Sequence, residues 1–176
     1  MLWVFIASAL FGYAVLPYLS RHASKTGALI GQPAPDFSLP VFHGGDADSR
    51  IQLSSLAGHV VVLDFWASWC KPCTAQARIL SAVAPRHAAA KVVFVGVNTA
   101  DNPGRAREFA RAHALPYPSV LDTDTGETAD AYGASSLPTL VVIDATGKVT
   151  SLASRIMSSE EIEAAIVQAA QTAVSQ

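Results

Sequence analysis

Cysteine is scarce in this chain, with only Cys70 and Cys73 among 176 residues. Two cysteines exclude a small fold held by a framework of several disulfides, and they exclude a structural zinc site with four cysteine ligands. A disulfide between them would close a very short loop and would restrain the unfolded chain little. The pair therefore needs an explanation other than structural support.

Basic clusters are also missing. The chain has 12 Lys and Arg against 14 Asp and Glu, which gives a net charge of −2. No basic stretch carries interleaved aromatic residues, so we expect no nucleic acid partner. The sequence has no internal repeat, and its hydrophobic content of 51% is ample for one core. These features predict one domain with an appendage.

Charge is absent from residues 2–19, which are almost wholly apolar. A helix of this length spans about 27 Å, close to the roughly 30 Å of a bilayer core. A cleaved signal peptide would carry a basic start and a site of small residues, and neither is clear here. A buried core helix is the third alternative. We predict a membrane anchor in residues 1–20, a linker in 21–32 and a globular domain in 33–176.

The two cysteines lie in Trp69-Cys70-Lys71-Pro72-Cys73. The apolar run 60–66 before them predicts a buried strand, and residues 74–85 after them predict a helix. Cys70 is therefore expected at a helix N-terminus, where the helix dipole lowers a thiol pKa and favours the thiolate nucleophile. Cys73 follows one turn later and could close or open a disulfide with it. This setting predicts reversible thiol–disulfide exchange, with a sulfur reachable from solvent.

The rest of the chain alternates between predicted strands and helices. The sequence predicts a first hairpin around residues 37–39 and 51–53, and a second hairpin of 140–144 with 148–152. Residues 91–98 form a further apolar run, and the helices are expected in 102–114, 125–132 and from Ser158 onward. Ser158 and Glu161 have the spacing of a capping box. This order predicts an α/β domain with a mixed central sheet flanked by helices.

Asp64 stands out because an acid inside an apolar strand is costly unless it is used or paired. If it is buried, its pKa should rise, and it could exchange a proton with Cys73. The alternative is an aspartate at a strand end that is hydrogen-bonded to backbone.

Four stretches carry a family resemblance, namely 64–73, Ser136-Leu137-Pro138-Thr139, 31–37 and 132–148. Together they resemble the thioredoxin superfamily, and within it the TlpA/ResA-like membrane-anchored thiol–disulfide oxidoreductases, over residues 31–170. The resemblance implies a thioredoxin-like fold whose mixed central sheet is flanked by helices. It also implies an N-terminal hairpin extension and one N-terminal transmembrane helix.

The resemblance also implies roles for individual residues. Cys70 would be the attacking nucleophile and Cys73 the resolving thiol of a redox-active disulfide. Pro138 would be in the cis form, packed near both sulfurs, and the Leu137 backbone would be available to a substrate chain. From the residues alone, Pro138 could equally be an ordinary turn proline.

Three further residues lie around the cysteines. Trp69 is expected to flank a substrate groove. Lys71 would add positive charge near Cys70 and lower its pKa, or would simply be solvated. Gln76 is a neutral amide where resembling reductases often carry an acid, so no role of that acid is transferred.

The expected function is a protein-disulfide reductase, tethered to a membrane and acting outside the cytoplasm, for example in cytochrome c maturation. Its partners would be protein disulfides or thiols, a membrane electron donor, and the bilayer through residues 2–19, with no metal or other cofactor. Arg21 and Lys25 favour the opposite orientation, but disulfides persist outside the cytoplasm. The alternatives are a Cu(I)-delivery protein using the same two thiols with a histidine, a peroxidase, and a non-catalytic scaffold.

Overall fold

The structure is a computed structural model that describes residues 29–46 and 48–172. No helix within these ranges has the length and apolar character needed to cross a bilayer. The expected anchor in residues 1–20 and most of the expected linker lie outside the described residues.

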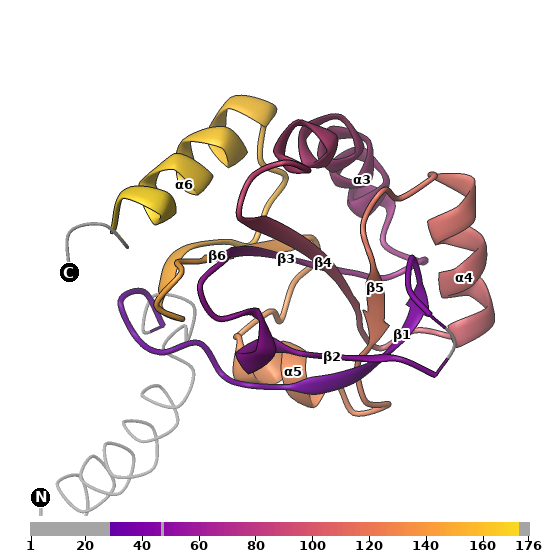
Figure 1. The fold of residues 1–176 in the computed structure, drawn as a ribbon. Coiled ribbons are helices and arrows are strands. Elements are labelled where there is room, and N and C mark those ends of the chain that lie inside the picture. Colours follow the sequence, from indigo (N-terminus) through magenta and orange to yellow (C-terminus); the bar gives the residue numbers. More distant parts are fainter. Residues whose placement is uncertain (1–28, 47, 173–176) are drawn as a thin grey trace, which may run out of the picture.

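Within the described residues, seven strands form one mixed sheet in the order β2-β1-β5-β4-β3-β6-β7. Figure 1 shows helices on both sides of this sheet. The parallel pairs are β3 with β4 and β4 with β5, and the remaining pairs are antiparallel, including β1 with β2. The strands are β1 (Ser38–His43), β2 (Arg50–Gln52), β3 (Val60–Trp66), β4 (Val92–Asn98), β5 (Ser119–Leu121), β6 (Thr139–Ile143) and β7 (Val149–Ala153).

Strand β3 is the centre of the fold, and all seven of its residues are buried. It lies between β4 and β6, and successive side chains point to opposite faces of the sheet. Val62 and Trp66 pack in one core cluster, which also contains Cys70 and Cys73, whereas Leu63 packs in the other. Both faces of β3 are thus covered by other parts of the chain, which explains its nearly continuous apolar sequence.

Helices α3 (Lys71–Val83), α4 (Pro103–Ala112) and α6 (Ser159–Thr172) contribute their buried apolar residues to the first cluster. Helix α5 (Glu127–Ala131) contributes to the second cluster, and Figure 1 shows it on the side of the sheet away from α3 and α6. Two short 3₁₀ helices, η1 (Leu53–Leu56) and η2 (Ala84–His87), are the other helical elements of the described ranges. The predicted α/β domain with a mixed sheet is confirmed.

The starts of two helices follow from the sequence. The Asn102 side chain accepts hydrogen bonds from the backbone N–H groups of Gly104 and Arg105 at the start of α4. At α6, Glu161 N–H donates to Ser158 Oγ and Ser158 N–H donates to the Glu161 carboxylate, so the predicted capping box is confirmed. Satisfying these free N–H groups fixes where each helix begins.

Candidate active site

The CxxC segment lies at the end of β3, where the chain turns into α3. Cys70 is the N-cap residue of α3, and the backbone N–H of Cys73 donates to Cys70 Sγ at 3.2 Å. The two sulfurs are bonded, with an S–S length of 2.07 Å. The predicted placement at a helix N-terminus is confirmed, but α3 begins at Lys71 rather than near residue 74. It begins earlier because the cysteine sulfur itself caps the first turn.

Both cysteines are more enclosed than the sequence analysis predicts. Only 4% of Cys70 and 2% of Cys73 is accessible to solvent. They pack within the same core cluster as Trp66 and Leu80, so little of the disulfide faces solvent in the oxidised state. Little of either cysteine is therefore open to a reaction partner in this state.

Asp64 lies on the same face of β3 as the cysteine cluster, because it is two residues from both Val62 and Trp66. It is 4% exposed, and burial raises its pKa to about 7, partly opposed by a hydrogen bond from Tyr117. Tyr117 Oη donates to Asp64 Oδ2 at 3.1 Å. The prediction that burial raises the pKa of Asp64 is confirmed, and its side-chain partner is this phenol rather than backbone.

The predicted proline loop lies next to this site. The Leu137–Pro138 peptide bond is cis, as the resemblance implies. Thr139 follows it, pairs with Phe65 near the end of β3, and donates through Oγ1 to the Ser136 carbonyl at 2.7 Å. Because β6 runs antiparallel to β3, the start of β6 meets the end of β3, where the CxxC begins. Pro138 is buried and Leu137 is half-buried.

A second loop holds the residues before the cysteines. Trp69 is 60% exposed, and its Nε1 donates to the Ala100 carbonyl at 2.9 Å. The Asp101 carboxylate accepts hydrogen bonds from Ser68 N at 2.5 Å and Ser68 Oγ at 2.8 Å. Asn98 Nδ2 also donates to Asp101, at 2.9 Å. The loop after β4 thus fixes the Ser68 backbone and the Trp69 side chain, which immediately precede Cys70.

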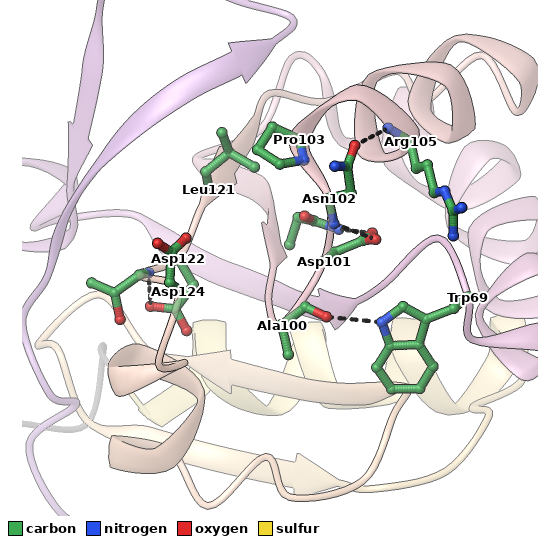
Figure 2. A pocket seen from close by; sticks show the side chains of 11 residues that line it. Trp69, Ala100, Asp101, Asn102, Pro103, Arg105, Leu121, Asp122 and Asp124 are labelled. Carbon is green, nitrogen blue, oxygen red and sulfur yellow. Dashed lines mark hydrogen bonds between the residues drawn. The ribbon is translucent and has the colours of Figure 1, made fainter.

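A cleft of about 550 Å³ adjoins Trp69. Figure 2 shows the indole at its edge, reaching to Ala100, with the loops after β4 and β5 forming the other walls. On one of these walls, the Asp122 carboxylate accepts hydrogen bonds from the backbone N–H groups of Thr128 and Ala129. The lining residues are Trp69, Asn98, Ala100, Asp101, Asn102, Pro103, Arg105, Leu121, Asp122, Thr123 and Asp124.

Lys71 and Gln76 lie on opposite sides of the first turns of α3. Lys71 is exposed at the first helical position. Gln76 is 1% exposed, and its Oε1 accepts a hydrogen bond from Met157 N at 2.8 Å. The amide therefore fastens α3 to the segment that precedes α6.

Sequence reasoning missed Tyr117. The stretch Leu115-Pro116-Tyr117-Pro118 reads as a helix breaker, and 53 positions separate this tyrosine from Asp64. The one available signal is the rule that a buried acid needs a partner, which does not say which residue supplies it.

The described part of the chain contains no group of three His, Cys, Asp or Glu side chains placed to hold a metal ion. One of the five histidines, His22, lies outside that part. A copper site with a histidine therefore has no support in the described geometry.

A thioredoxin-like sheet with a cysteine pair at a helix N-terminus and a cis-proline loop beside it defines a class of protein, the thiol–disulfide oxidoreductases of the thioredoxin fold. The profile of the AhpC/TSA family matches residues 30–152. ResA of Geobacillus thermodenitrificans is 31% identical over 155 residues, which cover 88% of this chain and 85% of the relative. ResA of Bacillus subtilis is 32% identical over 151 residues, covering 86% and 80%.

Solved structures agree with these sequence relatives. A Chlorobium tepidum protein assigned as a DsbE thiol:disulfide interchange protein superposes with a TM-score of 0.71 at 32% identity, covering 80% of this chain and 96% of that one. A secreted Mycobacterium tuberculosis disulfide oxidoreductase homologous to DsbE gives a TM-score of 0.65 at 27% identity, covering 75% and 95%. The chain belongs to the AhpC/TSA family and, within it, to the ResA/DsbE type of thiol–disulfide oxidoreductase.

Proposed function

We propose that this protein is a membrane-tethered reductant of protein disulfides outside the cytoplasm, with cytochrome c maturation as the setting that the family resemblance implies. The observation that carries the proposal is the bonded Cys70–Cys73 pair at the N-terminus of α3, on the same face of the sheet as the buried Asp64. The dithiol form of this pair is the reductant, and the disulfide is the spent form.

The first step is nucleophilic attack by Cys70. Its sulfur lies at the N-cap of α3, where the helix dipole and the Cys73 N–H stabilise negative charge. The Cys70 thiolate attacks one sulfur of the substrate disulfide and forms a mixed disulfide. The other substrate sulfur leaves as a thiolate and takes a proton from solvent.

The second step is resolution by Cys73. The Asp64 carboxylate, half ionised near neutral pH because its pKa is about 7, accepts the proton of the Cys73 thiol. The Cys73 sulfur then attacks Cys70 Sγ, closes the intramolecular disulfide and releases the second substrate thiolate. Two electrons have passed to the substrate, and a thiol-bearing donor at the membrane must return them.

Substrate binding is assigned to the rim around the sulfurs. Trp69 offers a large exposed apolar surface held in place by its bond to Ala100. The adjoining cleft is large enough for the side chains that flank a substrate cysteine. The half-buried Leu137 contributes its backbone, and Lys71 is the exposed cation closest in sequence to Cys70.

The direction of electron flow is tested by the reduction potential of the Cys70–Cys73 couple. A reductant should have a potential well below that of the strong oxidant DsbA, near the values of about −200 to −270 mV found for glutaredoxins and thioredoxin. Equilibrating the purified domain with thiol–disulfide buffers of known potential measures it. A value close to the roughly −120 mV of DsbA contradicts the assignment as a reductant.

The location is a second part of the proposal. Residues 1–20 anchor the chain, residues 21–32 link it, and 33–176 form the domain outside the cytoplasm, where protein disulfides persist. We expect a reporter fused after Gln176 to be active only outside the cytoplasm, and a full-length chain to sediment with membranes. Reporter activity confined to the cytoplasm contradicts this orientation.

A further inference from the structure

Asp64 is held by a single side chain of the described structure. Its Oδ2 accepts the hydrogen bond from Tyr117, whereas its Oδ1 is buried and has no hydrogen-bond partner among the described residues. One carboxylate oxygen is thus fixed and the other is left free. The free oxygen is the one available to receive a proton.

The sheet register explains how Tyr117 reaches this position. Asp64 pairs with Gly96 on β4, and Gly96 pairs with Ser119 on β5. Gly96 has no side chain, and the side chains of Ser119 and Trp66 fill the space beside it. Tyr117 precedes Ser119 by two residues, is 4% exposed and packs in the same core cluster as Trp66.

Among the described residues, no charged side chain is hydrogen-bonded to Asp64. The neighbours of Asp64 across the sheet are Gly96 and Leu140, neither of which ionises. On the helix side of the cluster lie Cys70, the N-cap of α3, and Cys73 in the first turn of that helix. On η2 and α6, His87 and Glu163 are hydrogen-bonded to each other at 2.7 Å, and the His87 ring lies 6.1 Å from the ring of Phe94.

From this geometry we propose that Tyr117 is a positioning residue for the exchange reaction, which stabilises the ionised Asp64 and leaves Oδ1 free for the Cys73 proton. This inference rests on the proposed function for the role of Asp64. The phenol keeps its own proton throughout, because burial and the neighbouring Asp64 raise the pKa of Tyr117 well above its ordinary value of 10. It therefore donates to the carboxylate and does not carry protons itself.

The test compares Tyr117→Phe with wild type. Phenylalanine keeps the ring and removes only the hydroxyl, and hydrogen bonds to charged groups are among the stronger ones. We expect the pKa of Asp64, read by carbon-13 NMR of the oxidised protein, to rise by about one unit. The pH at which resolution by Cys73 is half-maximal should rise by the same amount.

A matched control is Tyr132→Phe. Tyr132 is also fully buried and also loses one hydrogen bond, from its Oη to the Pro35 carbonyl at 2.7 Å, but it packs in the other core cluster. This variant should leave the pKa of Asp64 and the pH profile unchanged. An unchanged Asp64 pKa in Tyr117→Phe, or an equal change in Tyr132→Phe, overturns the inference.

A measurement on the wild type protects the test against a variant that fails to fold. With carbon-13 at Cζ of tyrosine, the Tyr117 resonance should move with a midpoint near pH 7 as Asp64 ionises, while that of Tyr132 should not. A flat Tyr117 resonance overturns the inference. These outcomes differ from failure of the proposed function, in which the wild-type dithiol would not reduce protein disulfides at any pH.

Discussion

Replacing Cys73 by serine is expected to arrest the reaction after its first step. Cys70 can still attack a substrate disulfide, but no second thiol lies one turn along α3 to release the mixed disulfide. A covalent complex with the substrate protein should therefore accumulate, and turnover should fall by several orders of magnitude because resolution must await an external thiol. Non-reducing electrophoresis followed by mass spectrometry of the trapped partner measures this result.

The matched control is Cys70→Ser, which should trap nothing and have no measurable turnover. A complex formed through Cys73 in that variant contradicts the assigned order of attack.

Adding Trp69→Ala to the Cys73→Ser chain should lower the rate of capture about tenfold for a protein disulfide, since it removes a large apolar contact. The control is Val167→Ala, which shortens an exposed apolar side chain far from the cysteines in sequence, on α6. It should leave the rate of capture unchanged.

Replacing Asp64 by asparagine is expected to change how stability depends on pH. Burial raises the pKa of Asp64 from 3.8 to about 7, so the folded protein binds a proton that the unfolded chain has already lost between these values. The contribution of this proton to the free energy of unfolding is complete below pH 3.8 and is lost as the pH rises through 7. Between pH 4 and pH 8, wild type should therefore lose on the order of 4 kcal/mol relative to Asp64→Asn.

Urea unfolding of the two oxidised proteins at both pH values measures this difference. The same variant should resolve mixed disulfides about 10²-fold or more slowly near neutral pH, because asparagine cannot accept the Cys73 proton. Its resolution rate should also lose the dependence on a group with a pKa of about 7. Parallel stability curves for the two proteins would contradict the burial of an ionisable Asp64, and an unchanged resolution rate would contradict its role in proton transfer.

Local patterns predicted much of the fold because each depends on residues close together in sequence. The apolar run at 60–66 coincides with β3, and Ser158 with Glu161 marks the start of α6. The cysteine pair could be placed at a helix start for the same reason. The enclosure of Cys70 was not predictable in this way, because burial depends on what packs over a residue from elsewhere in the chain.

The sequence by itself determined the chemistry of this protein: two cysteines three positions apart, after a buried strand and at the start of a helix, with an acid inside that strand. Only the tertiary structure decided how that chemistry is arranged. Parallel pairing of β3, β4 and β5 brings Tyr117 to Asp64, and the loop after β4 fixes Trp69 beside the sulfurs. These contacts join residues 31 to 53 positions apart, so they follow from sheet register and packing rather than from any local pattern.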